Sequence, residues 1–578
     1  TGSANIAIGH YALNDNTTGS NNLAIGRNAL AVSTTANDNV AIGYRVLDAN
    51  TSGSGNVGVG VSALGANTTA SNNTAIGYQA LTINTTGQSN TALGKSALGT
   101  NSTGSHNTAV GHNALVLATT ANANTAVGYQ ALFATTTGGN NVGVGNSALK
   151  ANTTGDGNVA IGKEALTANT TGSNSIAIGL NALQAQTTGG PNIAIGRDAL
   201  QSCTSGAEHN IAIGYDVMED LTTGDYNTAV GSYAMEETTT GANNTAVGYK
   251  ALEANTTGQL NVAIGYNALT AQNSDAYNTA VGANCLEATT TGAYNVAVGR
   301  LALAANTTGT QNVAVGYGAL DASNSDDNTA VGYQALTAAT TAANNTAIGH
   351  NAMAATTTGG ECTALGANAL IAHTTGIRNT ALGYNCLKSV TTGASNLAIG
   401  AYAGEDVTTA DSNTFVGYDS GPNVTTGHSN TTLGADTLHT CTTAINNIAI
   451  GNAAMYATTT TANTIAIGVN ALRYLTTGEY NTVIGYQACK TITTSSYNTA
   501  VGYEVLTAAT SGSNTGVGDR ALAAVTTGNY NTAIGQGAGY NITTGSTNVC
   551  LGHHAGQGQI TTTSSQLYIA RSNTGQSN

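Results

Sequence analysis

Hydrophobic and polar positions recur along this chain with a period of 17 residues. The phrase NTAVGYQAL occupies residues 124–132 and returns unchanged at residues 328–336. We number the repeat from the Gly that ends each Ala-Ile-Gly or Ala-Val-Gly triplet and its variants, as position 0. The copies then run from Gly9 to Gly552, number 33, and depart from the 17-residue spacing only three times. A fixed period of this length predicts a solenoid in which each copy forms one coil.

Two columns of the repeat are aliphatic. Position −1 is Ile, Val or Leu in all 33 copies, and position +4 is usually Leu. Met replaces Leu with little change of volume, so a column that accepts both is predicted to be a buried aliphatic slot. All four methionines of the chain fall at position +4: Met218, Met235, Met353 and Met455.

Positions −4 to 0, as in Asn-Thr-Ala-Ile-Gly, are predicted to form a short strand. Its side chains alternate, so positions −3 and −1 point to one side and the small residues to the other. We expect two short strands and two turns per coil, with the β-branched side filling the core. The Ala side would then need a cover, which predicts a homotrimer about the long axis. The Ala columns include Ala7, Ala24, Ala41 and Ala75 at −2, and Ala12, Ala29, Ala63 and Ala80 at +3.

Asn at position −4 is present in 30 copies, and the exceptions are Ser175, Cys362 and Thr464. A buried amide stacked on its own image can donate to one copy and accept from the next, so this column is predicted to be a structural ladder.

Two hydroxyl residues and usually a Gly precede the next Asn, and they are predicted to form a corner in which the Gly has a positive φ. All three irregular spacings fall there, at residues 204–210, 324–328 and 510–514. The corner is therefore expected to face solvent.

The composition limits which classes of partner are expected. The chain has 74 Gly, no Trp, 7% charged residues and a net charge of −14 without a basic block, so no nucleic-acid partner is expected. No apolar run approaches the ~18 residues of a membrane span, so no membrane insertion is expected. The start without Met suggests a piece of a longer or processed product. The seven cysteines form no C-x-x-C pair and are expected to be free thiols: Cys203, Cys285, Cys362, Cys386, Cys441, Cys489 and Cys550.

No catalytic, cofactor-binding or metal-binding residues are predicted, so no enzyme and no cofactor are expected. GVGVSA at residues 58–63 imitates a dinucleotide fingerprint, but it is the ordinary repeat with Gly58 in place of Ala. The adjacent His553 and His554 would point to opposite sides of a strand and could not share a metal. Three further histidines share position +1 with His553 and are expected to be solvated: His10, His112 and His350.

Position +1 is predicted to be an exposed aromatic column. Its rings could stack on sugars or a receptor, or could merely shield the turn beside the Gly, and we favour shielding. Arg27, Lys95, Lys163, Arg197 and Arg300 share the column. The twelve tyrosines are Tyr44, Tyr78, Tyr129, Tyr215, Tyr249, Tyr266, Tyr317, Tyr333, Tyr384, Tyr418, Tyr486 and Tyr503.

Two patterns follow from the Thr-rich corner. The Asn-Thr-Thr triplets match a glycosylation pattern, but the repeat makes them inevitable; they include Asn16, Asn67, Asn84 and Asn152. Regular Thr pairs also suggest ice binding. Only one Thr per coil would point outward, however, and nearby Tyr, Lys and Arg would break the flat array, so ice binding is a minor alternative.

The motif N-x-A-[IV]-G-x-x-A-L resembles the head repeat of trimeric autotransporter adhesins, whose left-handed parallel β-roll is built on a similar Ala-Ile-Gly motif. The resemblance covers nearly the whole chain and implies a left-handed roll, although that family's repeats are typically shorter. Near the C-terminus, LYIA within residues 561–578 is similar to the segment that precedes the self-cleaving intramolecular chaperone of many phage tail-fibre proteins.

The sequence thus predicts an all-β chain: a parallel β-solenoid of about 33 coils in an elongated homotrimeric fibre. Residues 1–559 would be the shaft, less regular over 400–559, and residues 560–578 a terminating strand and tail. The predicted function is attachment, as a phage tail-fibre shaft that presents a host-recognition end to a surface glycan or protein receptor. The expected location is the virion or the extracellular surface. The alternatives are a bacterial adhesin head and, less favoured, a polysaccharide-degrading spike.

Overall fold

The structure, a computed structural model, describes residues 1–274, 277–558 and 561–570. Every regular element in that part of the chain is a β-strand, and each of the 34 strands is three residues long. The chain divides into two compact units, Thr1–Ala293 and Tyr294–Asn578. A parallel β-solenoid with a 17-residue coil, as predicted, describes each unit.

The strands of the first unit are β1 Ile6–Ile8, β2 Leu23–Ile25, β3 Val40–Ile42, β4 Val57–Val59, β5 Thr74–Ile76, β6 Thr91–Leu93, β7 Thr108–Val110, β8 Thr125–Val127, β9 Val142–Val144, β10 Val159–Ile161, β11 Ile176–Ile178, β12 Ile193–Ile195, β13 Ile211–Ile213, β14 Thr228–Val230, β15 Thr245–Val247, β16 Val262–Ile264 and β17 Thr279–Val281.

Those of the second unit are β18 Val296–Val298, β19 Val313–Val315, β20 Thr329–Val331, β21 Thr346–Ile348, β22 Thr363–Leu365, β23 Thr380–Leu382, β24 Leu397–Ile399, β25 Thr414–Val416, β26 Thr431–Leu433, β27 Ile448–Ile450, β28 Ile465–Ile467, β29 Thr482–Ile484, β30 Thr499–Val501, β31 Thr515–Val517, β32 Thr532–Ile534, β33 Val549–Leu551 and β34 Leu567–Ile569. The strand β34 lies in the predicted terminating segment, and the predicted tail at residues 571–578 lies outside the described residues.

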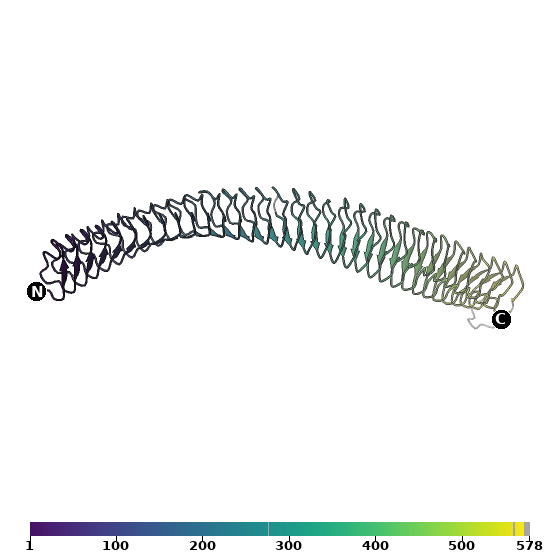
Figure 1. Cartoon of the computed structure of the whole chain (residues 1–578). Coiled ribbons are helices and arrows are strands. Elements are labelled where there is room, and N and C mark those ends of the chain that lie inside the picture. Colours follow the sequence, from purple (N-terminus) through teal and green to yellow (C-terminus); the bar gives the residue numbers. More distant parts are fainter. Residues whose placement is uncertain (275–276, 559–560, 571–578) are drawn as a thin grey trace. The chain divides into compact units, whose positions relative to one another are not determined.

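Within each unit, every strand pairs in parallel with the strand of the next coil, so the strands form one continuous sheet along the stack (Figure 1). The register holds where the spacing is irregular: Ile193 pairs with Ile211, and Thr499 pairs with Thr515. The inserted or deleted residue is therefore absorbed in the corner. Most residues of the three corner segments are exposed or half-exposed, as expected.

Each coil contains one strand, and the prediction of two was wrong. The rest of the coil is a chain of turns in which non-glycine residues take positive φ at fixed positions. Asn28 at +2 and Leu30 at +4, for example, have φ of 59° and 49°. Left-handed backbone is unfavourable for such residues by roughly 1 kcal/mol each, so packing between coils must hold them there. Sequence reasoning missed this because Leu does not normally indicate left-handed backbone.

The Gly at position 0 is required by two constraints. Gly77 has φ of +140°, and a Cβ built on it would lie 2.5 Å from the carbonyl oxygen of Gly94 in the next coil. The corner Gly differs from its prediction, because Gly19 and Gly53 do not take positive φ. A Cβ on Gly19 would instead lie 2.2 Å from the backbone oxygen of Ala36, which shows close packing between neighbouring coils.

The two sides of the strand are the reverse of the prediction. Ala24 and Ala75 at −2 and Ala29 at +3 are completely buried. Positions −3 and −1 face outward instead; Ile76 and Leu93, for example, are 38% and 45% exposed. The alternation was correct but was assigned to the wrong face, because a coil this narrow has room for Ala beside the buried Leu but not for two β-branched columns.

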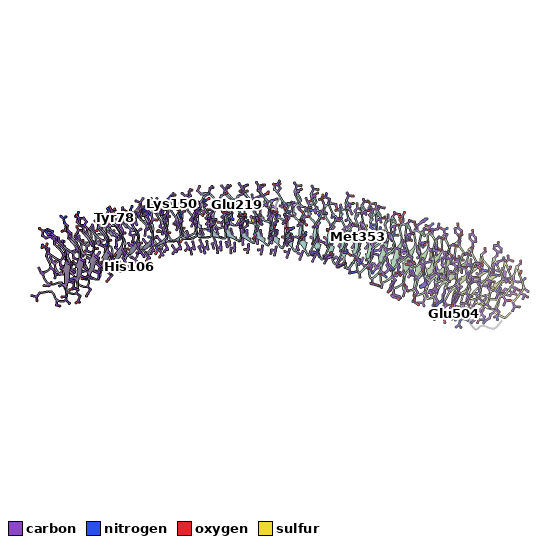
Figure 2. The ribbon with its side chains drawn as sticks, in the orientation of Figure 1. Tyr78, His106, Lys150, Glu219, Met353 and Glu504 are labelled. Atoms are coloured by element: carbon purple, nitrogen blue, oxygen red, sulfur yellow. The ribbon has the colours of Figure 1, made fainter. Side chains whose placement is uncertain are left out.

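The aliphatic slot at +4 is confirmed. All four methionines and every leucine of the column except Leu13 in the first coil are completely buried. Figure 2 shows Met353 within the stack while Tyr78 projects from it. Core volume is also compensated between coils. Gly404 and Gly421 replace Leu at +4 where Phe415 replaces Ala at −2, and a Cβ on Gly421 would meet the Phe415 ring at 2.4 Å. The Phe ring therefore fills the space that the two missing Leu side chains leave.

The Asn ladder at −4 is confirmed. The backbone N–H and the side-chain Nδ2 of Asn39 donate to Oδ1 of Asn22 at 3.0 and 3.1 Å, and the same Nδ2 donates to the Gly53 carbonyl. The three exceptions retain the acceptor. Oγ of Ser175, Sγ of Cys362 and Oγ1 of Thr464 each accept a hydrogen bond from the backbone N–H of the next coil.

A second buried column lies at position +7, and sequence reasoning did not single it out. In several coils it is Asn, and Asn84 donates to Oδ1 of Asn67 and to the Gly87 carbonyl. In others it is apolar, as at Leu221, Val424 and Ile492, all completely buried. The mixed polarity of the column hid its burial.

Candidate functional site

The most extensive surface feature of each unit is an uncharged strip formed by positions −3 and −1 of the sheet. Every residue at these positions is Thr, Val, Ile or Leu. Most are half-buried, and several at −1 are exposed, including Ile161, Ile213 and Ile264 in the first unit and Ile348, Leu365 and Leu433 in the second.

The size of this strip distinguishes it from scattered surface apolar residues. Two columns about 10 Å wide that rise ~4.8 Å per coil give roughly 800 Å² over the 17 strands of the first unit. The largest apolar patch of an ordinary soluble monomer is about 300–600 Å². The strip mixes Thr with aliphatic side chains, so only part of its area is apolar. Its continuity from coil to coil makes it a candidate surface for packing against another sheet.

The Tyr column at position +1 is exposed, as predicted. Its rings face one another where neighbouring coils both carry them: Tyr249 and Tyr266 stack with centroids 5.5 Å apart and planes within 12°, and Tyr486 and Tyr503 within 7°. Cations replace a ring elsewhere, as Arg27 lies 5.9 Å from the ring centroid of Tyr44. Since the ring faces contact each other, mainly their edges remain for a ligand. The shielding role of the column stays a prediction.

A second aromatic column, at position −5, was not anticipated. It comes directly before the buried Asn, so it precedes the strand, whereas position +1 follows it. The tyrosines of this column are exposed. Tyr480 and Tyr497 stack at 5.1 Å, and His209 stacks on Tyr226 at 4.9 Å. The sequence signal was available, since Tyr recurs five residues before the Gly in six copies. In sequence, the uncharged strip thus lies between two aromatic columns.

Several sequence candidates have structural explanations. Gly58 of GVGVSA faces Val46 of the preceding coil, which a Cβ would approach to 2.4 Å. Asn67 and Asn84 of the glycosylation triplets are completely buried, so a glycan could not be added to them in the folded chain. In most coils the first Thr of the corner pair bonds along the stack, as Thr68 Oγ1 donates to the Thr85 carbonyl, and Thr69 beside it is exposed.

The expectation for His553 and His554 rested on a wrong premise. They lie in the turn after β33 rather than in a strand, and their ring centroids are 4.0 Å apart. The pair is therefore not split between opposite faces. Among the described residues, neither belongs to a group of three or more converging metal-ligating side chains.

The cysteines are all buried and free, as expected. Burial raises the pKa of Cys203, Cys386 and Cys441 to about 12. Because the thiolate is the reactive form of cysteine, these side chains serve as core packing rather than as nucleophiles.

Charged side chains gather at positions +2 and +5 of the turn. Arg45 and Asp48 form an ion pair at 2.7 Å, and Lys250 and Glu253 another at 2.7 Å. A groove of about 670 Å³ beside the first pair is lined by Val32, Ser62 and other residues. It holds one ion pair rather than two facing carboxylates, so it does not resemble a glycosidase site.

No protein-family model matches the chain, and no curated protein matches it. In the part of the chain that the structure describes, no helix has the length and hydropathy to cross a membrane.

Proposed function

We propose that this chain is a structural fibre for attachment, with a phage tail-fibre shaft as the favoured setting. In this proposal its coils wind as a left-handed roll and three copies associate about a common axis. The observation that carries the proposal is the uncharged strip, which occurs in both units. Tandem coils give length, and the strip gives a reason to associate.

A dimer and a cyclic trimer would both bury the strips, since both are closed assemblies. The resemblance to trimeric adhesin heads is the reason that three chains are favoured. The interface is now assigned to positions −3 and −1, in place of the Ala columns, which are buried within each chain.

The assembly is tested by mass. A trimer of the 57.1 kDa chain should have three times that mass, about 171 kDa, by analytical ultracentrifugation. Replacing Ile76, Leu93 and Val110 by Asp should yield monomers or aggregates, because each charge would lie in the dry interface. A wild-type monomer, or an unaltered trimer in the triple mutant, would refute the assignment.

The matched control adds the same charges elsewhere on the same stretch of solenoid. Thr86, Thr103 and Thr120 are the exposed second residues of their corners. Their replacement by Asp should leave the trimer intact. Asp at the buried Ala75, Ala92 and Ala109 would not test the interface, because it would unfold the coil.

The biological setting is tested by location. Immunogold labelling of a culture that produces the chain should mark virion tails if it is a tail-fibre shaft. Label on cell surfaces would instead favour the adhesin head, and label on neither would refute both. Incubating the purified chain with host capsule and assaying new reducing ends tests the polysaccharide-degrading spike, for which we expect no release.

A further inference from the structure

Three metal-ligating side chains of the second unit converge on one point of the solenoid surface. Asp419 and Asp436 occupy position +2 of consecutive coils, and His439 lies at position +5 of the second coil. One ligand atom from each side chain lies within 4.8 Å of the other two. Stacking brings the two Asp residues together, since the N–H of Asp436 donates to the Tyr418 carbonyl at 3.1 Å.

The described residues leave these three groups without partners. Nδ1 of His439 is shielded from solvent and has no hydrogen-bond partner among them. Within the same part of the chain, the carboxylates of Asp419 and Asp436 take part in none of the ion pairs. All three residues are half-buried. His439 thus has a shielded ring nitrogen without a partner, and its ring converges on two mutually repelling carboxylates. A bound cation would offset the repulsion between the carboxylates and offer the ring a partner.

The imidazole is held in place by its surroundings. Its ring stacks on Tyr456 of the next coil, with centroids 4.7 Å apart and planes within 10°. The guanidinium of Arg473 covers the same Tyr at 5.3 Å from the ring centroid. The backbone carbonyl of His439 also accepts a hydrogen bond from Nδ2 of Asn423 at 2.6 Å. A fixed ring loses little freedom when it binds a metal, which favours binding.

A second cluster at the same positions of the first unit, Asp216, Glu219 and Glu236, differs in two respects. It consists only of carboxylates, and Arg197 or Lys250 lowers the pKa of each of them against the effect of burial. That cluster therefore serves as a comparison rather than as a site.

We propose that Asp419, Asp436 and His439 bind a divalent transition-metal ion, with Zn²⁺ as the best fit. An imidazole combined with carboxylates suits Zn²⁺ and its neighbours, whereas Ca²⁺ and Mg²⁺ prefer ligand sets made only of oxygen. The half-exposed position leaves room for water to complete the coordination. The ion joins two consecutive coils, so it acts as a clamp along the stack.

The test measures Zn²⁺ on the full-length protein by equilibrium dialysis with elemental analysis. We expect wild type to retain about one more Zn²⁺ per chain than His439→Phe, at a free concentration that saturates the site. The Phe variant preserves the stack on Tyr456, and the same column already contains Phe133. Affinity at the site should fall about tenfold or more, since even groups around metal ligands have effects of that size.

A second variant makes the conclusion independent of whether His439→Phe folds correctly. Asp436→Asn should lose binding to a similar extent, and it introduces a residue that position +2 already carries at Asn113 and Asn351 with positive φ. The double substitution Glu219→Gln and Glu236→Gln, in the comparison cluster, should leave Zn²⁺ binding unchanged.

Hydrogen exchange locates the ion. Zn²⁺ should slow amide exchange in peptides covering residues 417–456 of wild type and should have no such effect in His439→Phe. The proposal is overturned if the Phe and Asn variants retain Zn²⁺ as wild type does. It is equally overturned if protection by Zn²⁺ falls outside that segment, or if Ca²⁺ binds as tightly as Zn²⁺.

Discussion

Replacing His373 by Asn should remove a defined part of the acid sensitivity of the second unit. His373 lies at position +7 and is completely buried. Nδ1 is 3.0 Å from Oγ1 of Thr356, and Nε2 faces Nδ2 of Asn379 at 3.4 Å. An amide nitrogen can only donate, so this arrangement suits a neutral ring whose Nδ1 carries the proton and whose Nε2 accepts.

The magnitude follows from the pKa. Burial lowers the pKa of His373 from 6.5 to about 4, although the Gly376 carbonyl opposes the shift. The unfolded chain therefore binds a proton in a pH range where the folded chain does not. The stability from the neutral ring is complete above about pH 7 and is lost as the pH falls from 6.5 towards 4. At pH 4.5 the loss is about 2.5 kcal/mol.

The assay is hydrogen exchange of peptides covering residues 360–390, because coils of a solenoid can open locally. Position +7 already contains Asn at Asn50 and Asn84, so His373→Asn should keep the fold. Between pH 7 and 4.5, protection in wild type should fall about 70-fold more than in the variant, the equivalent of that free energy. Other acidic groups titrate in both proteins, so their contributions to the loss of protection cancel in the comparison.

A control region and a refuting result complete the design. Peptides covering residues 84–101, with Asn ladders at −4 and +7, should respond to pH identically in the two proteins. Equal loss of protection in wild type and variant over residues 360–390 would show that the ring is protonated in the fold, and would refute the reasoning.

Three further predictions concern the backbone, the thiols and the aromatic column. Gly77→Ala should lower the free energy of unfolding by about 3 kcal/mol, because both its φ and the carbonyl 2.5 Å from the new Cβ oppose it. Gly65→Ala, whose nearest contact is 3.4 Å, should change it by less than about 0.5 kcal/mol in the same thermal unfolding experiment. A thiol reagent at pH 8 should label fewer than one cysteine per native chain and all seven after denaturation, so rapid native labelling would contradict the burial that the structure shows. Attachment to the host should survive simultaneous Tyr-to-Ser changes at four residues of the position +1 column: Tyr249, Tyr266, Tyr317 and Tyr333. Lost binding by a variant that still forms the trimer would instead assign receptor contact to this column.

The repeat made much of the fold predictable from the sequence. A period of 17 residues with fixed Asn, Leu and Gly columns is compatible with few structures other than stacked coils. The burial of position +4 followed from methionines that occur nowhere else. The Asn ladder followed because identical residues in register meet their own images, so one column supplies both donor and acceptor.

The tertiary structure decided which side of the strand faces inward. Alternation defines two sides but does not say which is the core, and a reversal exchanges every side chain between core and surface. The outcome depends on the width of the coil, which in turn depends on left-handed residues such as Leu30 that no propensity predicts. We therefore assign the candidate interface to the uncharged strip rather than to the Ala columns.

The cluster of Asp419, Asp436 and His439 also required the structure. In the sequence these residues are 17 and three positions apart and resemble scattered polar side chains. The carboxylates of Asp419 and Asp436 meet only because consecutive coils stack with one repeat per coil. His439 joins them only because the turn brings position +5 beside position +2. The sequence by itself determined the period, the ladder and the aliphatic slot, since identical neighbours make those contacts repeat. Which side faces the core, and which side chains meet across coils, depended on the path of the backbone between the repeated residues.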